Sequence, residues 1–415
     1  MSKIKKTVES LVIGDRLSRK KISYFLLFIN VITSAAVSIY IPCLKHMAID
    51  LNTTNALMQM TIVAHLIGEF LGRILCGPLI DIYGFRAIIL PSLTISILGH
   101  LGCMISESLL FFIVMRFIQA VGASVVYIVS QSIINETFDE KGKNSVMGIL
   151  ELYQPIAWIL SPFAGSIIME VSNWRLSFLV LALAQMIGIV FFKAYPANSH
   201  KKKRIRFSFS IIIQDYKSIL KNSVFVIYAL IPGLFAGGYM IFATSCPFIC
   251  SQFYAGSSGN IAIFSTIPLF FYIIATFAYR IVVDRFGVKI ARRVGTSVYA
   301  FFGIYLSYLV IFDIHWSPRI LLILMCIQCF GSAFLVPVSV LKALQNSAIL
   351  STNIGASTVV IFRNLIMSFC ISAGVKFNSS ITTIMACIFI TVATIILLIT
   401  TRKFLRSRAN RKICK

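Results

Sequence analysis

Apolar runs of about 20 residues recur along nearly the whole chain, and they constrain its fold more than any other feature of the sequence. A helix needs a run of about that length to cross the hydrocarbon core of a bilayer. The composition agrees, because 58% of the 415 residues are hydrophobic and 13% are charged, whereas soluble domains carry about 25% charged residues. The sequence therefore predicts an all-α polytopic membrane protein.

The apolar runs predict twelve membrane-spanning helices in two halves of six. In the first half they cover residues 22–43, 56–80, 87–106, 109–131, 145–168 and 174–195. In the second half they cover residues 223–249, 259–282, 291–312, 318–341, 353–375 and 380–401. The expected organisation is an N-terminal tail (1–21), a first half (22–195), a basic linker (196–222), a second half (223–401) and a basic C-terminal tail (402–415).

The chain is strongly basic, with a formal net charge of +24. Such a charge is also the usual footprint of nucleic-acid binding, but the positions of the cations argue against it. Three of the 38 Lys and Arg lie deep within predicted spans (Arg73, Arg116, Arg363), four lie at or beyond the span ends on one side of the membrane (Lys45, Arg175, Arg319, Lys376), and the others lie toward the opposite side. The positive-inside rule makes the richer side cytoplasmic. We therefore expect both termini in the cytoplasm, a lipid bilayer around the chain and no nucleic-acid partner.

A short motif occurs at matching points of the two halves. "DIYGFR" runs from Asp81 to Arg86 after the second span, and "DRFGVK" runs from Asp284 to Lys289 after the eighth. Both read Asp-x-aromatic-Gly-apolar-basic, and the glycine permits a tight turn. Internal repeats at corresponding positions are typical of secondary transporters, whose substrate site lies between the halves near the midplane.

The second span carries His65, Glu69 and Arg73 at intervals of four residues. These side chains cover an arc of about 80° on one face of a helix. Because an ionised group at the bilayer centre costs roughly 2.5–3.5 kcal/mol, this face is expected to point into the protein. Gly68, Gly72 and Cys76 form a stripe of small residues beside it, which would let another helix approach closely.

The intramembrane charges have three interpretations, which the sequence leaves open. Arg73 can form a fixed ion pair with Glu69 or with Glu151 of the fifth span, because buried charges must be paired. Alternatively, Glu69 or Glu151 can carry a coupled proton, since a carboxyl group between an apolar surrounding and a cation can load and release one. The third interpretation is direct recognition of the substrate. His65 is more often a hydrogen-bonded helix residue than a proton relay.

Several segments resemble signatures of the major facilitator superfamily. "GPLIDIYGFR" (Gly77 to Arg86) resembles the signature between spans two and three, and "RFIQAVGAS" (from Arg116) resembles the span-four signature. "SPFAGS" (from Ser161) resembles the span-five motif associated with antiporters. More narrowly, "YIPCL" at Tyr40, "QMT" at Gln59, "NWRLSF" at Asn173 and "TSCPF" at Thr244 are similar to the bicyclomycin-resistance type of drug/proton antiporters. The resemblance covers nearly the full length of the chain.

The resemblance implies a twelve-helix major facilitator fold and export of a small organic or drug-like compound, driven by protons. It also implies a conformational latch, which would comprise Gly77, Asp81, Gly84 and Arg86 with their repeats Asp284, Arg285, Gly287 and Lys289. Ile82 and Phe85 stand where the family usually has basic residues. The alternative is that this loop only packs and orients the helices.

Two further expectations come from the resemblance. Pro162 and Gly165 would form a hinge or a seal against proton leak, and the alternative is a plain packing notch. The family's partner for Arg116 is an acidic residue on span one just before the Tyr-x-Pro, but Ser38 occupies that position. This loss makes an importer or facilitator without proton coupling the second candidate function. A receptor that kept the fold and lost transport is a third.

A substrate cavity for a small molecule is expected between the halves. Its expected residues are Asn30, Ser38, Gln119, Phe235, Tyr239, Phe242 and Arg363. Cys326 and Cys329 form a CxxC without a second pair, so no metal site is expected, and without a nucleotide-binding loop or catalytic constellation we expect neither a cofactor nor an enzyme. We expect a monomer in a bacterial inner (plasma) membrane.

Overall fold

The computed structural model describes residues 21–138, 146–147, 150, 153–194, 217–253, 258–312, 317–345 and 352–376, together with residues 391 and 394. Within these ranges the chain is helical and contains no strand. A helix over residues 21–38 comes first. The later elements are η1 (Ile41–Cys43), α2 (Leu44–Asp50), α3 (Asn55–Tyr83), α4 (Phe85–Met104), α5 (Leu109–Ala123), α6 (Val125–Thr137), α8 (Tyr153–Val171), α9 (Trp174–Ala194), α11 (Ser223–Phe253), α12 (Ser258–Phe286), α13 (Val288–Ile311), α14 (Pro318–Gln345) and α15 (Thr352–Lys376).

The helices coincide with the first eleven predicted spans. The predicted fourth span corresponds to α5 and α6 together, because Ser124 between them keeps helical backbone angles (φ −58°, ψ −25°). Eight of the described helices are long and apolar enough to cross a membrane. The predicted span 380–401 lies outside the described residues apart from residues 391 and 394. The all-α membrane fold expected from the sequence is confirmed.

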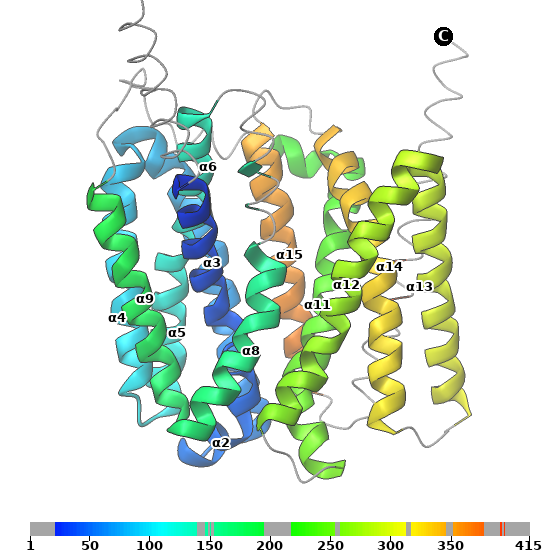
Figure 1. The fold of residues 1–415 in the computed structure, drawn as a ribbon, viewed down its shortest axis with the longest axis horizontal. Helices are drawn as coiled ribbons and strands as arrows, with labels where there is room; N and C mark the ends of the chain where they lie inside the picture. Colours follow the sequence, from blue (N-terminus) through cyan, green and yellow to red (C-terminus); the bar gives the residue numbers. More distant parts are fainter. Residues whose placement is uncertain are drawn as a thin grey trace, which may run out of the picture.

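The helices run roughly side by side along one direction (Figure 1), with η1 and α2 at one end of the molecule and the α3–α4 and α12–α13 turns at the other. We call these the η1 end and the Gly84 end. Between the first and second halves of the chain, α3 packs along α15 and α8 along α12. These two pairs of helices form most of the contact surface between the halves, and η1 packs against α11 and α12.

The buried cores show where the halves join. At the η1 end one core combines residues of both halves, with Tyr40, Trp174 and Phe178 from the first and Met240 and Phe242 from the second. Toward the Gly84 end each half has a core of its own. One is built from residues 26–192 and the other from residues 219–359. The two halves are therefore closed against each other at the η1 end.

The repeated motif gives the same backbone turn in both halves. Gly84 separates α3 from α4 with φ +79°, and Gly287 separates α12 from α13 with φ +80°. A positive φ of this size favours glycine, because a Cβ would clash with the backbone. The internal repeat read from the sequence is therefore present in the backbone of the two turns.

Candidate functional site

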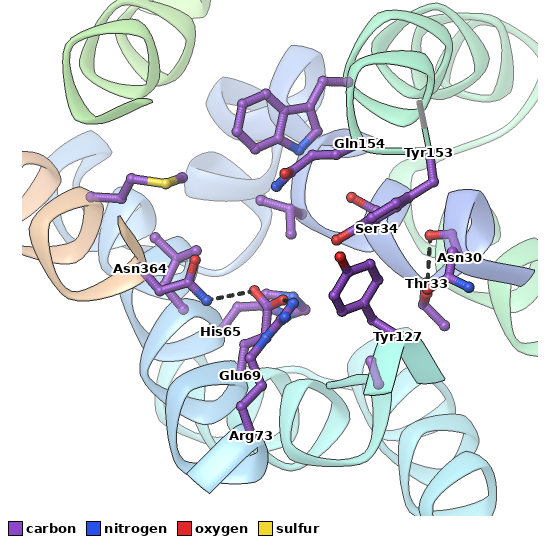
Figure 2. A pocket seen from close by; sticks show the side chains of 15 residues that line it. Asn30, Thr33, Ser34, His65, Glu69, Arg73, Tyr127, Tyr153, Gln154 and Asn364 are labelled. Atoms are coloured by element: carbon purple, nitrogen blue, oxygen red, sulfur yellow. Dashed lines mark hydrogen bonds and ion pairs between the residues drawn. The ribbon is translucent and has the colours of Figure 1, made fainter. Parts of the chain in front are cut away.

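A small polar cavity lies between the two halves and holds the charged face of α3 (Figure 2). Its lining residues come from the first helix, α3, α5, α6, α8 and α15: Asn30, Thr33, Ser34, Val37, His65, Leu66, Glu69, Arg73, Ala123, Tyr127, Tyr153, Gln154, Trp158, Asn364 and Met367. The cavity encloses about 30 Å³, which is room for about two water molecules. Pockets for drug-sized ligands enclose roughly 300–1,000 Å³, so a larger solute requires the halves to separate.

Glycines of α3 position the charged face. A side chain on Gly68 would collide with the Phe117 backbone of α5, and one on Gly72 would collide with Ser124 and the Val121 carbonyl. The small-residue stripe predicted from the sequence therefore lets α3 and α5 approach closely. The neighbouring charged face of α3 is consequently directed toward the cavity and the other half.

Glu69 is held by groups from both halves. Arg73, one turn further along α3, forms an ion pair and a hydrogen bond with one carboxylate oxygen. The other oxygen accepts a hydrogen bond from the Asn364 amide of α15, at 3.0 Å. Arg73 is buried and the Glu69 side chain is 18% exposed, so the pair is largely shielded from solvent and each charge needs the other. Glu69 thus lies at the point where the second helix of one half meets the C-terminal half.

A second polar contact crosses the same boundary. Arg363, which precedes Asn364 on α15, donates a hydrogen bond from Nη1 to Oε1 of Gln154 on α8, at 2.6 Å. Toward the η1 end, the Gln59 amide of α3 donates to the Thr244 carbonyl of α11, at 3.3 Å. These hydrogen bonds tie helices of the N-terminal half to helices of the C-terminal half on both sides of the cavity.

Aromatic rings form the rest of the cavity wall. The Tyr127 and Tyr153 rings lie 5.4 Å apart, and the Arg73 guanidinium lies 5.6 Å from the Tyr127 ring centre. Trp158 of α8 stacks on Tyr239 of α11, with ring centres 5.8 Å apart and planes at 15°. This stack also joins the halves. The cavity therefore combines a charged face with aromatic surfaces, as sites for amphipathic solutes do.

Several buried polar atoms of the lining have no hydrogen-bond partner among the described residues. They are Oδ1 of Asn30, Nδ1 of His65, Nε of Arg73 and Nε1 of Trp158. Buried polar groups are normally hydrogen-bonded, and ordered water or a ligand supplies the partner where the protein does not. The residues that line the cavity thus carry donors and an acceptor whose hydrogen bonds the described residues do not complete.

Arg116 lies outside this cavity in a fully buried network of α5. Its guanidinium donates to the Ala36 carbonyl (2.9 Å), to Oε1 of Gln119 (2.7 Å) and to the Tyr40 hydroxyl (3.3 Å), and it lies 4.5 Å from the Tyr40 ring centre. The Gln119 amide in turn donates to the His100 ring, at 3.1 Å. The described hydrogen-bond partners of Arg116 are all uncharged, as the absence of an acidic residue at position 38 suggested. The cation is held by dipoles and an aromatic face.

Ser38 contacts the span-five motif that begins at Ser161 and does not line the cavity. The hydroxyls of Ser38 and Ser161 share a hydrogen bond of 2.6 Å. Gly165 lies against the Ile39 carbonyl, where a Cβ would not fit, and its own carbonyl accepts a hydrogen bond from Sγ of Cys43 at 3.8 Å. Pro162 is buried in the same stretch of α8. The motif therefore packs α8 against the end of the first span.

Of the other predicted cavity residues, the two phenylalanines lie in hydrophobic cores. Phe235 packs edge-on against Tyr299 within the C-terminal half, with ring centres 4.6 Å apart. Phe242 packs near Phe264 in the core shared by both halves. Tyr239 stacks on Trp158, which lines the cavity, and Arg363 donates to Gln154, which also lines it. Asn30 lines the cavity directly. The structure thus brings together Asn30, His65, Glu69 and Arg73 in the wall of one cavity.

The second acidic candidate and part of the predicted latch lie outside what the structure describes. Glu151 lies outside the described residues. Gly77, Asp81 and Arg86 belong to α3 and α4, but their side chains are among those that the structure leaves undescribed. Asp284, Arg285 and Lys289 are exposed at the Gly84 end. The latch and the role of Glu151 stay predictions. Among the described residues no group of His, Cys, Asp and Glu could hold a metal ion.

The partners that α8 and α15 contribute to the cavity could not be singled out from the sequence. Gln154, Trp158 and Asn364 line the cavity but stood out in no motif. Asn364 had one usable signal, since it follows Arg363 in an otherwise apolar span and polar side chains there tend to face the bundle interior. Gln154 and Trp158 precede the span-five motif without a comparable signal.

Comparisons with known proteins agree with this architecture. The Major Facilitator Superfamily model matches residues 26–357. Curated relatives include the uncharacterised MFS-type transporter YdgK of Bacillus subtilis (24% identical; 58% of this chain and 60% of YdgK covered) and the bicyclomycin resistance protein homolog of Haemophilus influenzae (22%; 68% and 71%). The multidrug resistance protein MdtL of Shigella flexneri is 26% identical over 53% of this chain and 64% of MdtL. The match thus spans less than two thirds of YdgK and of MdtL.

Solved structures share the fold at low sequence identity. The xylose transporter XylE from Escherichia coli, in a partially occluded inward open conformation, superimposes with a TM-score of 0.68 at 13% identity, covering 93% of this chain and 99% of XylE. A point mutant of the nucleoside transporter NupG gives a TM-score of 0.68 at 13% identity, covering 92% of this chain and 99% of NupG. With the family model matched over most of its length and the fold shared with transporters of this type, the chain belongs to the Major Facilitator Superfamily and is a multi-pass membrane transporter, not an enzyme.

Proposed function

We propose that this transporter exports a small organic or drug-like compound in exchange for protons, and that Glu69 carries the proton. The observation that best supports this proposal is the position of Glu69, the one acidic residue among the described residues that line the cavity. Its carboxylate is bonded to Arg73 of its own half and to Asn364 of the other half. A group that carries a coupled proton must lie where the moving halves meet, and Glu69 does.

The geometry supports a simple exchange. While Glu69 is ionised, Arg73 and Asn364 satisfy its oxygens and the cavity is small. A proton on Glu69 neutralises the carboxylate, frees the Arg73 charge and weakens the bond to the C-terminal half. In the exchange the compound occupies the site after the proton has left it, and the surrounding residues Asn30, His65 and Trp158 carry polar atoms that lack partners among the described residues.

The similarity to drug-resistance proteins supports the outward direction. The bicyclomycin resistance protein homolog and MdtL are named for resistance, whereas XylE and NupG are named as xylose and nucleoside transporters and share the fold alone. The second candidate is an importer or facilitator without proton coupling. It is favoured by one observation: the described partners of Arg116 are uncharged, and Ser38 stands where the resembled antiporters have an acid.

We further propose a bacterial inner-membrane location with both termini and the linker in the cytoplasm, and action as a monomer. Charge asymmetry carries the orientation, because Lys and Arg concentrate on the side of the linker. With that orientation the η1 end faces outward, so the structure is closed toward the outside.

Proton movement in everted membrane vesicles tests the proposal. Cationic, neutral and zwitterionic compounds are added to energised vesicles that contain the wild type, Glu69→Gln or the control Glu107→Gln at equal abundance. Glu107 is an exposed carboxylate between α4 and α5, remote in sequence from the cavity-lining segments. We expect some compound to release protons through the wild type and Glu107→Gln but not through Glu69→Gln. An equal response from all three would exclude Glu69 as the proton carrier, and no response from any would favour the facilitator.

A further inference from the structure

Glu69 alone does not explain how proton movement is tied to movement of the halves. Coupling requires that the proton binds more tightly in one conformation than in the other, and the same factor then biases the conformations when the proton binds. A group that moves together with Glu69 cannot supply this difference. A group on the opposite half can.

Arg73 moves together with Glu69. Both residues lie on α3, one turn apart, so their ion pair is kept when the halves rock as rigid bodies. Asn364 lies on α15 of the C-terminal half and donates to Glu69 across the boundary, at 3.0 Å. The bond exists only while α3 and α15 pack together at this level.

From this geometry we infer that Asn364 is the residue that makes proton binding at Glu69 depend on the conformation of the transporter. The inference rests on the proposed role of Glu69 as proton carrier. Asn364 is a positioning residue in this scheme, since it acts on the carboxylate and carries no proton itself.

The sign follows from the chemistry of the bond. A carboxylate accepts a hydrogen bond more strongly than a neutral carboxylic acid does, so the Asn364 bond favours ionised Glu69 while the η1 end is closed. Protonation weakens the bond and favours opening of that end. By reciprocity, closing the η1 end expels the proton. With the η1 end outside, a proton is taken up from outside and released inside, which is the inward flow that drives the proposed export.

Other titratable and charged groups surround the same carboxylate. They are His65 and Arg73 on α3, Tyr127 on α6, Tyr153 on α8 and Arg363 on α15. Arg363 also belongs to the moving half, and its charge acts in the same direction, but its Nη1 is bonded to Gln154. Among the described hydrogen bonds across the boundary, the one from Asn364 is the one that ends on an acid.

The test measures the distance across the η1 end as pH is varied. Ketone-bearing amino acids at Ile49 of α2 and Ile263 of α12, both exposed, carry nitroxide labels so that the native cysteines stay unlabelled. Pulsed electron paramagnetic resonance on the full chain in lipid nanodiscs then gives the ratio of closed to open η1 ends. For the wild type we expect this ratio to fall about tenfold from high to low pH, the size expected from one hydrogen bond to a charged group.

Variants separate the coupling role of Asn364 from the proton-carrier role of Glu69. Asn364→Leu keeps the shape of the side chain without its donors, and Asn364→Ala serves if the leucine lowers the yield of folded protein. Both should reduce the tenfold change to about twofold or less, by loss of that hydrogen bond. Ser368→Ala, which removes a hydrogen bond one turn along α15 to the Asn364 carbonyl, should behave as the wild type. Glu69→Gln should make the ratio independent of pH.

Two results would overturn different claims. If both Asn364 variants keep the full pH response while Glu69→Gln loses it, Glu69 remains the carrier and Asn364 is not the coupling residue. If Glu69→Gln keeps the pH response, the proposed proton carrier itself is wrong.

Discussion

Replacing Gly165 by alanine would force α8 away from the first span. The new methyl group would occupy the position of the Ile39 carbonyl oxygen, which is backbone and cannot rotate away. The displacement would also stretch the hydrogen bond between Ser38 and Ser161, now 2.6 Å, and the contact from Cys43 to the Gly165 carbonyl. The substitution therefore tests how tightly the antiporter-like motif is packed.

The size of the effect follows from three contributions. Forcing an extra methyl group into a packed interior costs about 1–3 kcal/mol, and losing the serine hydrogen bond costs about 1 kcal/mol. Against these, alanine is favoured over glycine within a helix by about 1 kcal/mol. Gly188→Ala on α9 is the matched control, because its Cβ would meet the flexible end of Ile29. The helix contribution cancels in the comparison, which leaves Gly165→Ala less stable by about 2–4 kcal/mol.

Heating the purified proteins and measuring the folded fraction by gel filtration checks this difference. We expect the midpoint of Gly165→Ala to lie at least about 4 °C below that of Gly188→Ala. Equal midpoints would refute the close contact between Gly165 and Ile39. Proton leak into liposomes, measured on the same proteins, separates the two interpretations of the motif: a seal leaks after the substitution, and a packing notch does not.

Three further perturbations have defined outcomes. Gly84→Ala should lower the free energy of unfolding by about 1–3 kcal/mol through local backbone strain alone, since φ is +79°, ψ is 154° and no atom beyond the adjoining residues lies within 4 Å of the new Cβ; an unchanged thermal midpoint would contradict this. Arg116→Lys should reduce the yield of folded protein, because lysine cannot reproduce three hydrogen bonds and an aromatic contact, whereas Arg293→Lys at an exposed position of α13 should leave it unchanged; similar yields would count against the buried network. Trp158→Leu should increase the open fraction of the η1 end in the distance measurement about twofold to tenfold, since the stack on Tyr239 is worth about 0.5–1.5 kcal/mol; an unchanged distance distribution would show that the stack does not hold the halves together.

Local patterns were sufficient to predict the helices and part of the site. The apolar runs predicted the spans because lipid imposes a length on every crossing helix. The spacing of Glu69 and Arg73 permitted their pairing, which was one of the alternatives that the sequence left open, since residues four apart share one face of a helix. The glycines at positions 84 and 287 predicted equivalent turns, because a repeated backbone conformation needs a repeated residue. Each of these inferences depends on residues that are close together in the chain.

The contacts between the halves could not be predicted in this way. Asn364 bonds to Glu69 across 295 residues of sequence, and Arg363 bonds to Gln154 across 209. These contacts depend on how α15 is rotated and shifted against α3 and α8, which no local pattern encodes. The position of Ser38 likewise depends on helix packing, because its hydroxyl shares a hydrogen bond with Ser161 of α8 and does not line the cavity. The charged residues could therefore be predicted as a site, but their partners could not.

Substrate exchange and proton-driven accumulation in proteoliposomes separate movement of the halves from proton coupling at Glu69. A compound identified in the vesicle assay is loaded on both sides, and its exchange is compared with its accumulation under an imposed proton gradient. The account predicts that Glu69→Gln keeps the exchange, because a neutral side chain still permits the halves to move, but loses accumulation because no proton is carried. Accumulation equal to that of the wild type in Glu69→Gln would contradict the account and leave the ion pair with Arg73 a structural feature.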